Sequence, residues 1–178
     1  MLDCDAVLFD CDGVLVDCEP ITNAVLCRLL GELGWPLTLQ ECMAHFVGHA
    51  VMDRAALIEQ KTGYFPQPDW MARFRVERND ALARELQPIA GIVQVVPAVH
   101  AALQGRIACA SGADRHKVQL QIDKIGLSPY FCDRIFSGHE MARSKPFPDV
   151  YQAAAAALGV PPQRCAVVED TVPGVQAG

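Results

Sequence analysis

The feature that most constrains this sequence is an apolar run near its start that ends on two carboxylates. Residues 6–9 (AVLF) lead directly into Asp10, and Asp12 and Gly13 follow. A short apolar run bounded by turn residues is typical of a buried strand, so both acids are expected where that strand opens into a loop. In open α/β sheets, ligands bind outside the carboxyl ends of the strands. Because two acids there need a cation or another partner, the stretch indicates a metal site that faces a phosphate.

Length and charge limit the classes of function. The chain has 178 residues, which suffices for one domain or for a core with an insertion. Its formal net charge of −6 argues against broad binding to nucleic acid or to an anionic membrane. A small anionic substrate stays compatible with that charge, because one lysine and a metal can reverse the local field. Acids at Asp3 and Asp5 do not fit the basic start of a signal peptide, and no apolar run approaches the ~20 residues of a membrane span, so we expect a cytoplasmic protein.

The eight cysteines form neither a C-x-x-C pair nor a pattern with zinc spacing. Several lie within apolar runs, as Cys109 does in residues 107–110. We therefore interpret them as small buried hydrophobic residues in a reducing compartment.

Residues 17–87 are expected to form an all-helical insertion. Pro20 suits the first turn of a helix that Gly34 ends, and Thr38 with Glu41 forms a capping-box pattern at the start of the next helix. Apolar residues recur at helical spacing along this region. The expected helices cover 20–33, 39–46, 51–61 and 69–86.

Two sets of charged residues are interpreted as solvent-facing. One lies on the last helix of the insertion, and the other lies in the first turn of a helix that follows Asp114. The first set is Arg73, Arg75, Glu77, Arg78 and Arg84, and the second is Arg115, His116 and Lys117.

From residue 92 onward, helices and strands alternate. Strands are expected at 106–110, 134–136 and 165–168, and each ends in polar residues. Helices are expected at 92–103, after Asp114 up to Gly126, and at 149–158. With the first strand, this alternation predicts a doubly wound parallel α/β sheet built from residues 1–16 and 88–178.

All strands of a parallel sheet present their carboxyl ends at one edge. Groups that are far apart in the sequence should therefore converge there. They supply a nucleophile, an acid/base, a hydroxyl, a cation and a pair of metal-binding acids, which are the parts that phosphoryl transfer needs. The residues are Asp10, Asp12, Ser111, Lys145, Glu169 and Asp170.

These residues carry a resemblance to the haloacid dehalogenase (HAD) superfamily. A helical insertion directly after the first motif resembles the small C1-type cap of subfamily I, which includes phosphoglycolate, sugar-phosphate and phosphogluconate phosphatases and β-phosphoglucomutases. The resemblance implies a Rossmann-like HAD core and spans nearly the whole chain. The four motifs are residues 10–17 (DCDGVLVD), Ser111, Lys145-Pro146 with Asp149, and Glu169-Asp170 with Gly174.

The resemblance implies a Mg²⁺-dependent phosphatase for a small phosphorylated metabolite. Asp10 is the expected nucleophile, which forms an aspartyl-phosphate, and Asp12 is the expected acid/base. Mg²⁺ is expected on the Asp10 carboxylate, the Asp12 backbone carbonyl and Asp170, with Glu169 in the outer shell.

The resemblance also implies groups that hold the substrate. Ser111 and nearby backbone N–H groups, including that of Gly112, are expected to bind phosphoryl oxygens, and Lys145 is expected to neutralise charge. A turn serine and a solvated lysine are the plainer alternatives. In the insertion, the residues that surround Gly48 are candidates for contact with the substrate, although plain exposed polar residues are the favoured interpretation there. The candidates are His45, His49 and Arg54.

Three other functions share parts of this pattern. A β-phosphoglucomutase-like phosphomutase would carry a cap arginine three residues after Gly48, where this chain has Val51. A phospho-acceptor of the response-regulator kind would lack Asp12 and the insertion. A dehalogenase would need neither Mg²⁺ nor the pair Glu169-Asp170.

The chain stops at Gly178, whereas similar family members continue after the fourth motif. A core truncated there would leave the strand at 165–168 as an exposed edge, and an inactive truncated HAD-like protein is the corresponding alternative. The sequence leaves the oligomeric state open.

Overall fold

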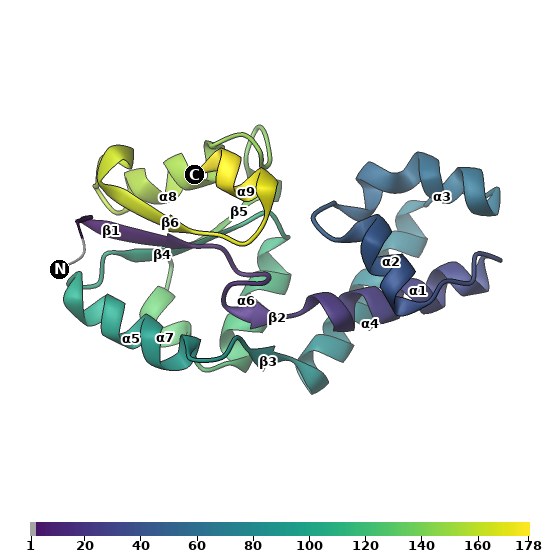
Figure 1. The fold of residues 1–178 in the computed structure, drawn as a ribbon, viewed down its shortest axis with the longest axis horizontal. Coiled ribbons are helices and arrows are strands. Elements are labelled where there is room, and N and C mark those ends of the chain that lie inside the picture. The colour runs from purple at the N-terminus through teal and green to yellow at the C-terminus, as the bar shows by residue number, and fades with distance from the viewer. Residues whose placement is uncertain (1–2) are drawn as a thin grey trace. The chain divides into compact units, whose positions relative to one another are not determined.

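A computed structural model describes residues 3–178 as two compact units (Figure 1). The sheet unit comprises Met1–Asp17 and Gln87–Gly178, and the helical unit comprises Cys18–Leu86. Asp17 and Gln87, which the sequence pattern assigns to the insertion, pair with each other in a short antiparallel ribbon of Val16–Asp17 (β2) and Gln87–Pro88 (β3). The ribbon lies where the chain leaves the sheet unit after Asp17 and where it returns at Gln87.

The sheet unit contains a parallel sheet of four strands in the order β5-β4-β1-β6. Phe9 of β1 pairs with Cys109 of β4 on one side and with Val168 of β6 on the other. The predicted parallel α/β sheet is confirmed, and all four strands direct their carboxyl ends to one edge. The strands are Ala6–Phe9 (β1), Ile107–Ser111 (β4), Ile135–Ser137 (β5) and Cys165–Val168 (β6).

Helices cover both faces of this sheet. Leu8 packs with Val150 and Ala154 on one face, whereas the next residue, Phe9, meets the ring of Phe131 edge-on at 6.1 Å on the other. This alternation is the two-residue period of a strand. Figure 1 shows α8 and α9 on one side of the sheet and α5 to α7 on the other. The helices are Ile92–Ala102 (α5), Arg115–Lys124 (α6), Ser128–Phe131 (α7), Asp149–Ala157 (α8) and Val172–Ala177 (α9), with 3-10 turns at Gly138–Glu140 (η2) and Pro162–Arg164 (η3).

Burial differs among the strands. Every residue of β1 and β4 is buried, because each has a strand on both sides and helices above and below. Among residues 3–178, strand β6 pairs with β1 alone, and its residues are half-buried or, at Val168, exposed. The expectation of an exposed edge at residues 165–168 is therefore confirmed, and these residues are less buried than their apolar sequence indicates.

The helical unit packs four helices around an apolar cluster. Leu26 and Leu30 of the first helix, Phe46 of the second and Phe74 of the fourth belong to it. The helices are Glu19–Glu32 (α1), Leu39–Phe46 (α2), Ala55–Thr62 (α3) and Pro68–Glu85 (α4). The single helix expected at 51–61 is wrong at its start, since Val51–Arg54 (η1) forms a 3-10 turn before α3. Within residues 3–178, no helix is both long and apolar enough to cross a membrane.

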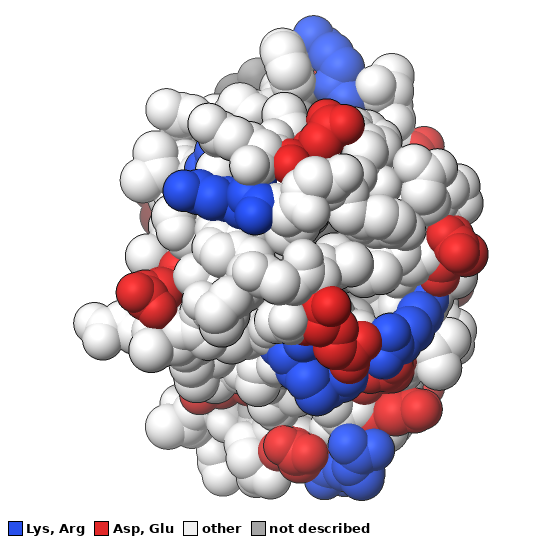
Figure 2. All heavy atoms as spheres, turned by 90° about the vertical axis from the view of Figure 1, so that its right-hand side faces the viewer, with Lys and Arg blue, Asp and Glu red and all other residues white. Residues whose placement is uncertain are grey.

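The charged residues of α4 differ from the predicted solvated face at one position. Arg73 pairs with Glu32 at 2.7 Å and with Glu77 at 2.7 Å on the surface, and Figure 2 shows acidic and basic side chains interspersed on this end of the molecule. Arg78, in contrast, is buried, with its guanidinium carbon 5.7 Å from the centre of the Phe74 ring. Its guanidinium group lies over the face of the Phe74 ring.

The start of α2 provides a test of local stability. The Thr38 hydroxyl accepts a hydrogen bond from the Glu41 N–H at 3.3 Å, and the Glu41 carboxylate accepts one from the Thr38 N–H at 2.8 Å, so the predicted capping box is confirmed. We expect Thr38→Ala to lower the free energy of unfolding of the helical unit by about 1 kcal/mol, because a helix N–H loses its partner. Denaturant unfolding followed by tryptophan fluorescence measures this, since Trp35 and Trp70 both lie in this unit.

The matched control is Thr38→Ser, which keeps the hydroxyl and should retain most of the stability. An equal loss for both variants would contradict the capping role.

Candidate active site

Asp10 lies where β1 ends, between the ends of β4 and β6. Its N–H donates to the Val168 carbonyl at 3.0 Å, which continues the β1–β6 ladder by one residue. The residue is 5 % exposed. Burial raises the pKa of Asp10 to about 7, although the Lys145 charge opposes that rise. A carboxylate is thus fixed at the carboxyl edge of the sheet and is costly to keep ionised without a cation.

Lys145 supplies that cation. Its Nζ lies 2.9 Å from Asp10 Oδ1 and 2.5 Å from Glu169 Oε1, so one ammonium group bridges two acids. Its side chain is 9 % exposed, so the alternative of a solvated lysine is wrong. Burial by itself would lower the pKa of Lys145, but the attraction of Asp10 and Glu169 outweighs it and raises that pKa. The centre of the Tyr151 ring, 4.8 Å from Nζ, closes a further side of the ammonium.

Glu169 is held by donors on both of its oxygens. Oε1 accepts from Lys145 and, at 3.1 Å, from the Tyr151 hydroxyl. Oε2 accepts from the Asp170 N–H at 3.0 Å and from the N–H and hydroxyl of Thr171, each at 2.9 Å. Burial alone would raise its pKa, yet these hydrogen bonds lower it below the usual range. Glu169 therefore stays ionised with its oxygens already engaged.

Asp170 lies beside these groups but is exposed. One carboxylate oxygen from each of Asp10, Glu169 and Asp170 lies within 4.8 Å of the others. Partial burial and the charge of Glu169 raise the pKa of Asp170. Three acidic oxygens this close together form a donor set that suits a hard divalent cation.

Two glycines make room for these acids. A Cβ on Gly13 would lie 2.0 Å from an Asp170 oxygen, and Gly13 also has a φ of +78°, which other residues resist. A Cβ on Gly174 would lie 1.8 Å from Glu169 Oε1. Both carboxylates can approach the site only because these two positions lack a side chain.

Asp12 does not belong to the cluster of three acids. Its Oδ2 accepts from Lys117 Nζ at 2.6 Å, and its Oδ1 accepts from Gln121 Nε2 at 2.9 Å. Lys117 is buried, so its interpretation as a residue of an exposed first turn is wrong. Arg115 and His116 of the same turn are exposed as expected.

Sequence reasoning missed Lys117 and Gln121. The available signal was a pair of polar residues at i and i+4 beside the apolar Val118 and Ile122, which places both on the inward face of α6. That spacing shows that Lys117 and Gln121 share the inward face of α6, but it does not show which acid they contact.

Ser111 and Gly112 lie at the end of β4. Ser111 is 1 % exposed, and its hydroxyl accepts a hydrogen bond from the Ala113 N–H at 3.1 Å. The serine therefore shapes the turn that follows its strand, while its own O–H keeps a proton to donate. Gly112 lies against the backbone of Gly138, where a Cβ would be 3.2 Å from the Gly112 Cα.

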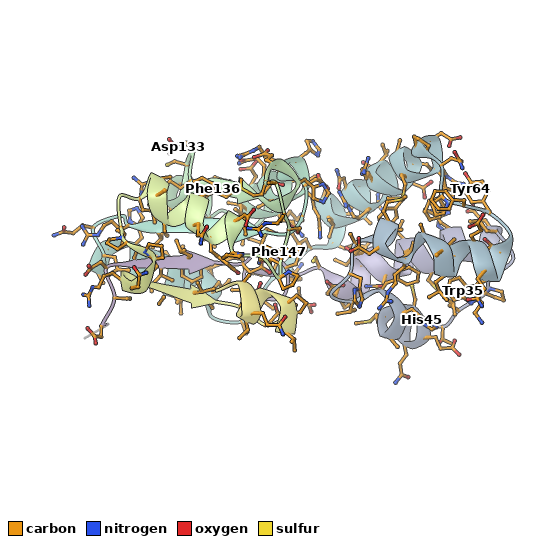
Figure 3. The ribbon with its side chains drawn as sticks, turned by 90° about the horizontal axis from the view of Figure 1, so that it is seen from above. Trp35, His45, Tyr64, Asp133, Phe136 and Phe147 are labelled. Atoms are coloured by element: carbon orange, nitrogen blue, oxygen red, sulfur yellow. The ribbon has the colours of Figure 1, made fainter. Side chains whose placement is uncertain are left out.

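The remaining predicted residues lie in the helical unit. His45 is half-buried, and its ring centre is 5.5 Å from that of Trp35. Figure 3 shows the two side chains near each other in the helical unit. His49 is exposed. The Arg54 Nε is buried and has no hydrogen-bond partner among residues 3–178. The structure thus brings Asp10, Lys145, Glu169 and Asp170 close together in the sheet unit. His45, His49 and Arg54 belong to the helical unit.

Residues 4–178 match the model of the haloacid dehalogenase-like hydrolases. The chain is 31% identical over 177 residues to the 6-phosphogluconate phosphatase of Escherichia coli (strain K12), which covers 98% of this chain and 77% of that protein. It is 46% identical over 72 residues to the chloroplastic protein SUPPRESSOR OF QUENCHING 1 of Arabidopsis thaliana, but this covers 40% of the chain and 7% of the plant protein.

Among solved structures, a HAD family hydrolase from Deinococcus radiodurans R1 with bound phosphate and sodium is 34% identical. It superposes with a TM-score of 0.76 and covers 98% of this chain and 76% of that one. The family model and the Escherichia coli relative both extend over nearly all of the residues, and the chain therefore belongs to the haloacid dehalogenase-like hydrolase family.

Proposed function

We propose that this protein is a Mg²⁺-dependent phosphatase that hydrolyses a small phosphorylated metabolite through an aspartyl-phosphate on Asp10. The observation that carries the proposal is the buried ammonium of Lys145, which joins Asp10 to Glu169 beside Asp170. A carboxylate held in place beside an ammonium group is suited to attack a phosphoryl group, because the ammonium offsets the repulsion between the two anions.

The reaction divides into two displacements. In the first, an Asp10 oxygen attacks phosphorus, the bond from phosphorus to the ester oxygen breaks, and Asp12 gives its proton to the leaving alkoxide. In the second, Asp12 takes a proton from water, the water oxygen attacks phosphorus, and the acyl–phosphate bond breaks to release inorganic phosphate and free Asp10. Lys145, Ser111 and the backbone N–H groups near Gly112 hold the charge on the phosphoryl oxygens.

The residues present fit Mg²⁺. The Asp10 carboxylate, the Asp12 backbone carbonyl and Asp170 would hold the ion, and it would supply positive charge that offsets the phosphoryl oxygens. Glu169 suits the outer shell, because both of its oxygens already accept hydrogen bonds from protein donors. Gly13 and Gly174 support the fit, since their missing side chains leave space for Asp170 and Glu169.

The substrate class follows from similarity. A relative that is 31% identical over 98% of the chain is a 6-phosphogluconate phosphatase, which favours a sugar phosphate, phosphogluconate or phosphoglycolate. Gly112, His45, His49 and Arg54 are the residues we propose for substrate contact.

Replacement of the nucleophile tests the mechanism. We expect Asp10→Asn to lower Mg²⁺-dependent hydrolysis of 4-nitrophenyl phosphate by about 10³-fold or more, because an amide oxygen is a poor nucleophile toward phosphorus. Circular dichroism should show an unchanged fold. Asp133→Asn, an exposed acid in the same unit, is the control and should keep full activity. Activity retained in Asp10→Asn would remove the residue from this role.

Metal binding is tested at Asp170. We expect Asp170→Asn to raise the Mg²⁺ concentration for half-maximal activity by about 10- to 100-fold, because a charged ligand is lost from the site. The measurement is a Mg²⁺ titration of hydrolysis at fixed substrate, again with Asp133→Asn as the control. An unchanged half-maximal concentration would exclude Asp170 as a ligand.

The ionisation of Asp10 gives a pH prediction. Since burial raises the pKa of this carboxyl to about 7 without metal, it should be mostly protonated below that pH and mostly ionised above it. Bound Mg²⁺ favours the carboxylate and should move the midpoint to lower pH. Carbon-13 NMR of labelled aspartate carboxyls, with Asp10→Asn for assignment, measures both midpoints. A metal-free midpoint below about 5 would contradict the expected effect of burial.

A further inference from the structure

Helix α6 directs two side chains to Asp12. Lys117 Nζ lies 2.6 Å from Asp12 Oδ2, and Gln121 Nε2 lies 2.9 Å from Oδ1, so each carboxylate oxygen has a donor of its own. The Lys117 side chain is 7% exposed, and Gln121 is fully buried. A lysine in the first turns of a helix can usually extend into solvent, so its burial against one acid is a specific arrangement.

The orientation of the Gln121 amide is fixed from its other end. The Cys11 thiol donates to Gln121 Oε1 with a sulfur–oxygen distance of 3.3 Å. This bond directs the NH₂ group of Gln121 toward Asp12 and not away from it. Cys11 therefore acts on its sequence neighbour through a side chain 110 residues away.

The two donors come from a rigid element, whereas Asp12 lies on a turn. The Asp114 side chain caps α6 by accepting from the Lys117 N–H at 2.9 Å. Asp12, in contrast, precedes Gly13 in the turn between β1 and β2. A carboxylate on a turn has several orientations available, and donors on a capped helix select one of them.

We propose that Lys117 and Gln121 are positioning residues that fix the Asp12 carboxylate for proton transfer during phosphate ester hydrolysis. The inference rests on the proposed function, in which Asp12 gives a proton to the leaving oxygen. Lys117 and Gln121 contact Asp12 and act through it. They should therefore affect those hydrolysis rates that depend on proton transfer from Asp12 to the leaving oxygen.

The basicity of the leaving group separates positioning from a purely structural role. Phenyl phosphate and 4-nitrophenyl phosphate share the same ring, but phenolate is the more basic leaving group and needs the proton more. Loss of a well-placed general acid should therefore slow phenyl phosphate hydrolysis more than 4-nitrophenyl phosphate hydrolysis. A general loss of fold, metal or phosphate binding would lower both rates alike.

The experiment compares kcat/KM for the two esters in the full chain with saturating Mg²⁺, since kcat/KM reports the step that phosphorylates Asp10. Gln121→Met and Lys117→Met remove the donors and keep the shape of the side chains. We expect the ratio of phenyl to 4-nitrophenyl kcat/KM to fall about tenfold or more in each. Lys117→Arg, which restores a charged donor, should recover most of the ratio.

Matched controls lie on the same helix. Gln119 donates to Asp123 at 2.9 Å on the outer side of α6, and Lys124 is exposed in its last turn. Gln119→Met and Lys124→Met should leave the ratio within about twofold of the wild-type value, because neither side chain contacts Asp12.

The outcomes test the positioning role of Lys117 and Gln121 separately from the proposed phosphatase function. An unchanged ratio in Gln121→Met, with or without lower activity on both esters, overturns the positioning role. That neutral variant decides the matter alone if Lys117→Met does not fold. If the wild-type chain hydrolyses neither ester with Mg²⁺, the proposed function is overturned, and this inference falls with it.

Discussion

The candidate active site depends on the buried ammonium group of Lys145. Lys145 lies between Asp10 and Glu169, and without it two carboxylates would face each other at the edge of an apolar sheet. Their mutual repulsion and lost hydration would raise the pKa of at least one of them far enough to neutralise it. The lysine keeps Glu169 ionised and moderates the effect of burial on Asp10. The chemistry proposed for the site requires this balance of charge.

The sheet topology places these charged residues close together. Strand β1 lies between β4 and β6, so the residues that follow these three strands converge although about 60 to 160 positions separate them in sequence. Helix α8 supplies Tyr151, which contacts both Lys145 and Glu169 and so ties the helix layer to the site. The apolar core thus does more than stabilise the fold, because it fixes the strand ends that carry the charges.

Much of this arrangement follows from local sequence patterns. Apolar runs that end in Asp10, Ser111 and Glu169 predict strands with functional ends, and Thr38 predicts a helix start that the structure confirms. Features that depend on tertiary packing could not be predicted in this way. Lys117 and Arg78 look like surface residues in sequence, yet one is buried against Asp12 and the other against Phe74.

Gly174 is a helical glycine whose lack of a side chain is required by the neighbouring carboxylate of Glu169. It lies inside α9, where helix propensity alone favours alanine by about 1 kcal/mol. Replacement of helical glycines by alanine is a common route to more stable variants, and this position would be among the first chosen. Here the added methyl group would occupy the space of a Glu169 oxygen. A stabilisation strategy guided by backbone propensity would therefore displace the acid that anchors Lys145, so engineering of this fold should leave that glycine untouched.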